Sequence, residues 1–339
     1  TKPKAFGQLR CSAIRESNDM KYLSLSLLGI ALLAGFIGPG AVAADSFSAG
    51  LVQFNAGRWQ QASDLFVQAA SEKPDDVVRR ITAGVALANL KLYGPAVEQF
   101  EAASCLAPDA ALPVLLLSGV KGEMRQANVL KTQQAPGLSQ PGQWHRRNET
   151  VLEKALSESV ARYPSNSIAQ CLLGDLAQLR GLVPEARQRY HHAAELAPSW
   201  PKPMFNLGIA ALQANPEVAR ASFLQVTRMD PSNSRAYLWL GDAYSREGNV
   251  EQAIASYEQA AKDEALMAEA RTRIASAQMQ AGNYVQAVQD FALAEKQAPD
   301  DVRPVAGQGQ VLHRMGKPKE AEKKFSQAAR LSAANEGSP

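Results

Sequence analysis

The sequence predicts an all-α protein, built as a solenoid of about eight stacked pairs of antiparallel helices. Three observations support this prediction. Prolines recur with a period of 34 residues, small and aromatic residues recur at fixed places between them, and the composition is 46% hydrophobic but only 6% aromatic, which is typical of helical proteins. Although 339 residues would ordinarily suggest two or three domains, a solenoid grows by adding units rather than by enlarging one core.

The prolines define the repeat. Pro74 and Pro108 are 34 residues apart, and Pro198 and Pro231 are 33 apart, which indicates a single deletion. The spacing from Pro108 to Pro164 is 56, which corresponds to one repeat with 22 additional residues. Proline cannot continue a helix, so each of these residues is expected to end the second helix of its unit.

Between the prolines, the same residue types recur in register when each proline is numbered as position 32. Position 8 is small, as are positions 20 and 27, and position 24 is aromatic in seven of the units. The residues at position 8 are Gly50, Gly84, Gly174, Gly241, Ala275 and Gly309. Those at position 24 are Phe66, Phe100, Tyr190, Phe223, Tyr257, Phe291 and Phe325. Eight units can therefore be recognised, from about residue 45 to residue 333.

These residue types indicate two helices per unit, helix A at positions 1–14 and helix B at positions 18–31. Small residues allow the two helix axes to approach closely. The aromatic residue is expected to fill the space between one helix pair and the next. Glycines at position 15 are expected to end helix A, because glycine is favoured directly after a helix. They are Gly57, Gly181, Gly248, Gly282 and Gly316.

With these positions, the sequence resembles the tetratricopeptide repeat family over nearly its whole length after residue 44. The clearest unit begins with residues 236–244, Ala-Tyr-Leu-Trp-Leu-Gly-Asp-Ala-Tyr, and departs from the family mainly at position 4, where Tyr237 replaces tryptophan. The resemblance implies a right-handed superhelix in which the A helices line a concave groove. It also implies a non-catalytic protein that binds a segment of a protein partner in that groove.

In this family, positions 2, 5, 9, 12 and 13 of helix A face a bound peptide. The resemblance therefore implies a partner-binding surface that mixes apolar residues with charges of both signs. The candidate residues are Asp175, Gln178, Phe205, Ile209, Gln213, Arg235, Leu238, Asp242, Arg246, Thr272, Ser276 and Gln280. Relatives that bind the C-terminal carboxylate of heat-shock chaperones have lysine at position 5 and asparagine at position 9. None of units four to eight has this pair, which disfavours that ligand class.

The third unit departs from the pattern. Its two helices are expected near residues 112–123 and 149–163, separated by an insertion at 126–148 that is rich in Pro, Gly and Gln. Trp144, Arg146 and Arg147 near the end of this insertion have the composition of a contact surface. The alternative is a tolerated insertion in which Trp144 folds back onto the array.

The segment before the array resembles an export signal at residues 20–44. Lys21 precedes an apolar stretch at 22–37, and small residues follow it, so cleavage is expected near Ala43 or Ala44. This predicts a periplasmic or secreted protein. The alternative is an uncleaved membrane anchor, although the apolar stretch is shorter than the roughly 20 residues that a spanning helix needs. The predicted organisation is thus an upstream segment (1–19), the signal (20–44), the array (45–333) and a short tail (334–339).

Charge and residue types exclude several functions. The net charge is +3, but residues 45–339 contain 31 basic and 31 acidic residues, so no general attraction to nucleic acid is expected. His191 and His192 are adjacent on one helix and point about 100° apart, so they cannot bind one metal ion together. No pattern of a catalytic, cofactor-binding or metal-binding site is present. Cys105 and Cys171 fall in the second and fourth units, which are not expected to touch in an open solenoid.

Two functions therefore remain open. The first is an exported adaptor that binds a partner segment in the groove and assists the assembly of an envelope or secretion complex. The second is a structural spacer or tether in a polysaccharide-export or membrane-associated machine, with peripheral membrane association through that complex. Neither the identity of the partner nor the oligomeric state follows from the repeat.

Overall fold

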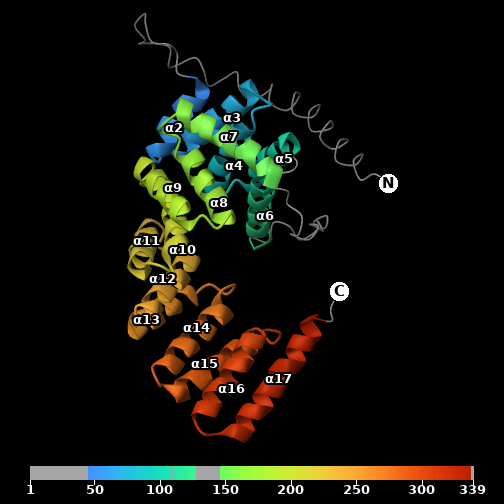
Figure 1. Cartoon of the computed structure of the whole chain (residues 1–339), viewed down its shortest axis with the longest axis vertical. Helices are drawn as coiled ribbons and strands as arrows, with labels where there is room; N and C mark the ends of the chain where they lie inside the picture. The colour runs from blue at the N-terminus through green and yellow to red at the C-terminus, as the bar shows by residue number, and fades with distance from the viewer. Residues whose placement is uncertain (1–44, 108–109, 127–145, 337–339) are drawn as a thin grey trace, which may run out of the picture. The chain divides into compact units, whose positions relative to one another are not determined.

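The computed structural model describes residues 45–107, 110–126 and 146–336, and all the regular structure in these ranges is helical (Figure 1). The predicted upstream segment and export signal, and most of the predicted insertion, lie outside the described residues. Within these ranges, no helix combines the length and the apolar character that crossing a membrane requires. The chain forms two compact units, the N-terminal unit up to Trp200 and the C-terminal unit from Pro201.

The N-terminal unit contains eight of the helices. They are α2 (Ser46–Asn55), α3 (Trp59–Glu72), α4 (Val77–Asn89), α5 (Tyr93–Leu106), α6 (Ala111–Gln126), α7 (Arg146–Arg162), α8 (Ser167–Leu179) and α9 (Val183–Leu196). Helices α2 and α3, α4 and α5, and α8 and α9 pack as pairs, which confirms the predicted repeat. Helix α6 packs against α5 in the same way that each A helix packs against the preceding B helix.

The C-terminal unit contains the other eight helices of the described residues. They are α10 (Pro201–Ala211), α11 (Pro216–Met229), α12 (Ser234–Arg246), α13 (Val250–Ala260), α14 (Met267–Gln280), α15 (Tyr284–Gln297), α16 (Val302–Arg314) and α17 (Pro318–Glu336). Consecutive helices pack against each other throughout this row, and α17 is its last member (Figure 1). Helix α17 continues to Glu336, past the predicted end of the array at residue 333.

In six of the helix pairs within the described residues, a glycine at position 8 lies against the aromatic ring at position 24. A Cβ atom on Gly84 would lie 2.6 Å from the ring of Phe100, so only glycine leaves room for the ring. The same contact joins Gly50 to Phe66, Gly174 to Tyr190, Gly208 to Phe223, Gly241 to Tyr257 and Gly309 to Phe325. The prediction that the aromatic ring lies between successive pairs was therefore incomplete, because the ring first packs within its own pair.

The turn after helix A also follows the repeat. The glycines predicted at position 15 have positive φ angles, 74° at Gly57 and Gly181, a conformation that strains other residues. In the second unit the same position is Lys91, whose φ is 59°. A lysine here adopts the left-handed conformation at a cost of roughly 1 kcal/mol.

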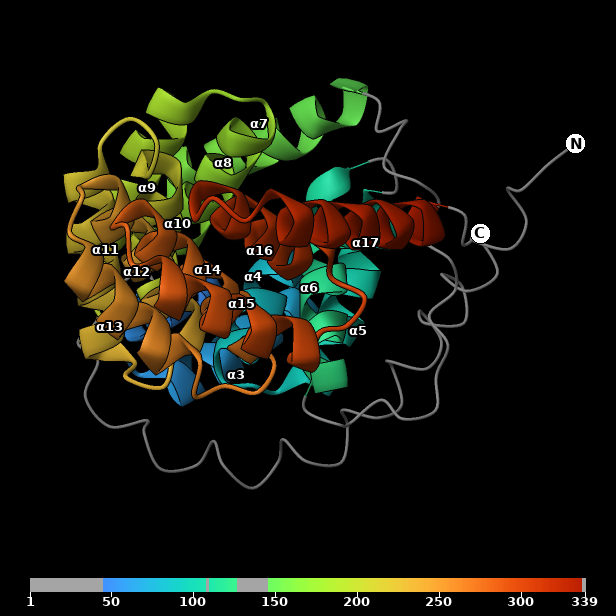
Figure 2. The same ribbon diagram turned by 90° about the horizontal axis from the view of Figure 1, so that it is seen from below.

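The third unit is not an ordinary helix pair. Helix α7 lies beside α8 in both views (Figures 1 and 2) and packs against α4 of the second unit as well as α8. Residues of the α7–α8 region also contact α2, as the hydrogen bond from Asn55 to the backbone of Ser165 shows. The expectation that non-adjacent repeats do not touch is thus wrong in the N-terminal unit.

Candidate functional site

In the N-terminal unit, the groove positions of the first helix are filled by the protein's own side chains. Phe47 and Phe54 occupy positions 5 and 12 of α2, where a bound peptide would be expected, and they are 1% and 0% exposed. The ring of Tyr163 lies 5.1 Å from that of Phe47, and the ring of Trp200 lies 5.0 Å from that of Phe54. Aromatic pairs at these distances are favourable. This face of the N-terminal unit therefore belongs to its core.

Polar contacts fasten the same face. The Asn55 amide donates to the carbonyl oxygen of Ser165 at 2.8 Å and accepts from the hydroxyl of Ser167 at 2.7 Å. Asp45 accepts hydrogen bonds from Tyr163 at 2.8 Å and from the buried guanidinium of Arg79 at 2.9 Å. These contacts join the first repeat to the third and fourth, 110 or more residues away along the chain.

Asp45 is held in its charged form by these partners. Burial raises the pKa of Asp45, but hydrogen bonds from the backbone and hydroxyl of Ser48 and from Tyr163, together with the charge of Arg79, outweigh it and lower the pKa from 3.8 to about 2. Burial and the hydrogen bond to Asp45 raise the pKa of Tyr163. The cluster is therefore charged and hydrogen-bonded at neutral pH, as a structural fastening requires.

The A helices of the C-terminal unit are linked by a chain of charged groups. Arg273 of α14 donates to Asp242 of α12 at 2.9 Å and also to Glu269 of α14. Glu269 is in turn 4.0 Å from Arg303 of α16. Since these residues come from three successive A helices, the helices present one common surface. We call the residues at positions 2, 5, 9, 12 and 13 of α10, α12, α14 and α16 the A-helix surface.

The linked groups have perturbed ionisation. Burial lowers the pKa of Arg273, but the charges of Asp242 and Glu269 outweigh it and raise the pKa overall. Burial raises the pKa of the Tyr257 hydroxyl, and the charge of Asp242, to which it donates a hydrogen bond at 2.7 Å, raises it further. Asp242 thus serves as the acceptor that joins α12, α13 and α14, which gives a residue predicted for the groove a structural role.

The structure distributes the predicted groove residues among three environments. Leu238 and Thr272 are buried, and Phe205 and Ile209 are partly buried against the core around Phe223. Gln213, Arg235, Arg246 and Gln280 are exposed, and Ser276 is half-buried. In the N-terminal unit, both Asp175 and Gln178 accept hydrogen bonds from the hydroxyl of Tyr190. Of the predicted insertion contacts, Arg146 and Arg147 lie in the first turn of α7, and Trp144 lies outside the described residues.

The A-helix surface has an excess of positive charge. Its basic residues are Lys202, Arg235, Arg246, Arg303 and Arg314, whereas its only two carboxylates within the described residues are Asp242 and Glu269. Both carboxylates are already bound by Arg273, and among the basic residues Arg303 is bound by Asp301 at 2.7 Å. Sequence reasoning missed Lys202, Arg303 and Arg314, although applying the same positions to helices α10 and α16 would have found them. The surface is therefore suited to an acidic segment rather than a basic one.

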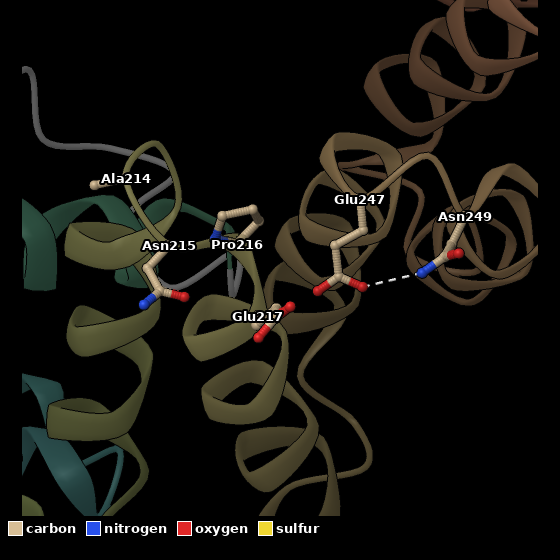
Figure 3. Close-up of a pocket in the computed structure, with 6 residues that line it drawn as sticks. All are labelled: Ala214, Asn215, Pro216, Glu217, Glu247 and Asn249. Carbon is tan, nitrogen blue, oxygen red and sulfur yellow. Dashed lines mark hydrogen bonds between the residues drawn. The ribbon is translucent and has the colours of Figure 1, made fainter.

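A hollow opens between the turns at α11 and α13 and has a volume of about 650 Å³ (Figure 3). It is lined by Ala214, Asn215, Pro216, Glu217, Glu247 and Asn249. Glu247 accepts a hydrogen bond from Asn249 at 3.0 Å, and the Nε of Arg220 donates to its two carboxylate oxygens at 2.9 and 3.0 Å. Because the Glu247 carboxylate already binds Arg220 and Asn249, we assign the hollow no binding function. Nowhere in the described ranges do three potential metal-binding side chains come together.

Comparison with known proteins supports the repeat directly. The family profile of the tetratricopeptide repeat matches residues 205–255 and 241–302. Residues 205–302 thus match the tetratricopeptide repeat, and the glycine–aromatic contacts continue the same repeat in register outside this range. Proteins of this family bind protein or peptide partners and are generally non-catalytic, so the fold is that of a protein-interaction scaffold. No curated protein sequence matches the chain.

Several solved structures resemble parts of the chain at low sequence identity. MamA from Desulfovibrio magneticus RS-1 is 17% identical, with a TM-score of 0.46 over 50% of this chain and 96% of that chain. YrrB, described as having an unusual peptide-binding site, is 17% identical, with a TM-score of 0.44 over 53% of this chain and 93% of that chain. The Cut9–Hcn1 complex is 13% identical, with a TM-score of 0.49 over 84% of this chain and 52% of that chain.

Proposed function

We propose that the A-helix surface of the C-terminal unit binds an acidic segment of a partner protein. The observation that carries this proposal is the contrast between the two units. Tyr163 and Trp200 cover the groove positions of α2, whereas Arg246 and Arg314 on the A-helix surface are exposed. Phe205 and Ile209, which are partly buried, add apolar contact area beside these charges.

Arginine is well suited to this role. Its planar guanidinium binds a carboxylate through two parallel hydrogen bonds, and it loses less hydration than lysine does when it is covered. The ion pair of Arg273 with Asp242 joins α14 to α12, so Arg246 at the end of α12 is presented on a rigid support. An extended or helical segment with several Asp or Glu residues matches such a row of cations.

A binding experiment with peptides of defined charge tests this proposal. We expect a fluorescent glutamate-rich peptide to bind, and its affinity to fall about tenfold or more in the double variant Arg246→Glu and Arg314→Glu, because two attractions become repulsions. The control is Lys296→Glu, which makes one such charge reversal on the exposed part of α15 and should leave the affinity unchanged. Equal binding of a lysine-rich peptide, or an unaffected double variant, would contradict the proposal.

We further propose that the protein is exported and acts in the assembly of an envelope or secretion complex. The apolar segment at 22–37 and the small residues before Asp45 support export. Expression in an exporting bacterium, followed by mass determination of the periplasmic protein, should give a chain that begins at residue 44 or 45. A membrane-bound chain of full mass would instead support the anchored alternative.

A structural spacer is the second candidate function. The filled groove of the N-terminal unit favours it, because a unit without an open groove is suited to holding distance and shape. If a partner identified by cross-linking remained bound to the Arg246→Glu and Arg314→Glu double variant, its contacts would lie elsewhere, and the spacer function would be favoured.

A further inference from the structure

Helices α2 and α17, the first and last helices of the described residues, expose the two halves of a repeat junction. At internal junctions, the position-24 aromatic residue of one pair packs against positions 7 and 10 of the next A helix. Phe223 packs with Leu240 and Ala243 in this way. Tyr257 makes the equivalent contacts with Ile274 and Ala277.

The exposed fractions of the residues at positions 24 and 10 distinguish the internal junctions from the two end helices. The aromatic residues Phe66, Phe100, Phe223, Tyr257 and Phe291 are at most 2% exposed, whereas Phe325 in the last helix is 42% exposed. On the other half, the position-10 residues Ala86, Val120, Ala243, Ala277 and Val311 are at most 8% exposed, whereas Val52 in the first helix is 59% exposed. An apolar junction face therefore remains open on α17.

We propose that α2 of one copy of this protein covers α17 of a second copy and so forms a repeat junction between two chains. Val52 and Ala49 occupy positions 10 and 7 of α2, the positions that meet the aromatic ring at internal junctions. In the same register they would meet Phe325, and Ala329 on the next turn of α17 is exposed and small enough for close approach.

The polar residues beside this face are compatible. At the α5–α6 junction, positions 25 and 11 form the ion pair of Glu101 with Lys121 at 3.1 Å. At the proposed junction the same positions are Ser326 and Gln53, which can form a hydrogen bond and bring no like charges together. The occupant that the internal junctions specify is an A helix, and α2 has that register.

This contact is head to tail, which distinguishes it from a two-fold dimer. Each copy in the assembly uses two different surfaces, so one copy at each end keeps an unused surface unless the assembly closes into a ring. A symmetric contact of α17 with α17 would instead use one surface and stop at a dimer. The two arrangements therefore respond differently to single substitutions.

The test uses sedimentation velocity of the full chain across a range of concentrations. We expect the wild-type protein to associate, and both Val52→Asp and Ala329→Asp to weaken association at least tenfold, because each places a charge in an apolar contact. The matched control is Val285→Asp on α15, which is 58% exposed and outside both faces, and it should associate as wild type. Phe325 itself is unsuitable because it packs against Gly309 within its own pair.

Mixing the variants decides the orientation. Val52→Asp retains an intact α17 face and Ala329→Asp retains an intact α2 face, so an equimolar mixture should form a one-to-one dimer that grows no further. Thermal unfolding of each variant alone would show that its fold is retained. A wild-type chain that stays monomeric, a Val52→Asp variant that still self-associates, or a mixture that stays monomeric would overturn the proposal.

Discussion

Replacing Asn55 with alanine tests whether the first repeat is fastened to the fourth. Asn55 makes two hydrogen bonds to the segment before and at the start of α8, through Ser165 and Ser167. At about 1 kcal/mol each, their loss weakens the attachment of α2 by about 2 kcal/mol. Local opening of α2 should therefore become about 30-fold more frequent. Hydrogen exchange measured by mass spectrometry should show this increase in peptides from α2.

The pattern along the chain matters as much as the size of the effect. In the wild-type protein α2 should exchange as slowly as α4, because both lie in the closed core, whereas the last turns of α17 should exchange fast. The control is Asn249→Ala, since Asn249 is exposed and donates only to nearby Glu247. If α2 frays in the wild-type protein, or if Asn55→Ala leaves its exchange unchanged, the closure of the N-terminal unit is refuted.

Three further predictions concern stability. Lys91→Gly should raise the free energy of unfolding by about 1 kcal/mol in urea titrations, since it relieves a left-handed lysine. Gly84→Ala should lower it by about 1–3 kcal/mol because its Cβ meets the Phe100 ring, whereas Gly94→Ala, with nothing within 4 Å, should be neutral or stabilising. The charged form of Asp45 stabilises the fold by about 1 kcal/mol, a value reduced because its side chain is 38% exposed. This stabilisation is present above pH 4 and is lost as the pH falls through about 2. Asp45→Asn should therefore flatten this part of the stability–pH curve.

The repeat was predictable because its signals are local and recur. In most units a glycine at position 8 is followed by an aromatic residue sixteen residues later. The two lie on the two helices of one pair, so the spacing between them is nearly constant and can be read from the sequence. The exception at Gly208 shows the limit of counting. Numbering from Pro231 places a leucine at position 8, because the deletion falls between the two helices. Counting from Pro198 would have identified Gly208, which contacts Phe223 as its counterparts do.

The closure of the N-terminal unit could not be predicted from the period. Phe47, Leu51 and Phe54 fit an A helix equally well whether they line a groove or lie in a core. The partners that decide between these, Tyr163 and Trp200, are more than 100 residues away and fall outside the positions that define the repeat. One sequence signal was present, since three large apolar residues at groove positions of one helix are unusual for a surface left open to water.

The departure in the third unit explains why the two units differ. An ordinary B helix would follow helix α6 after about three residues and pack beside it, leaving the face of α2 and α4 open. Here residues 127–145 separate the two helices, and α7 packs on α4 and α8. Tyr163, which directly follows α7, thereby reaches Phe47 and Asp45. The C-terminal unit has no such insertion, and its A helices keep an exposed row of arginines. The groove positions are therefore covered in the N-terminal unit and exposed in the C-terminal unit. For this reason we expect a partner to bind at Arg246 and Arg314 rather than at α2.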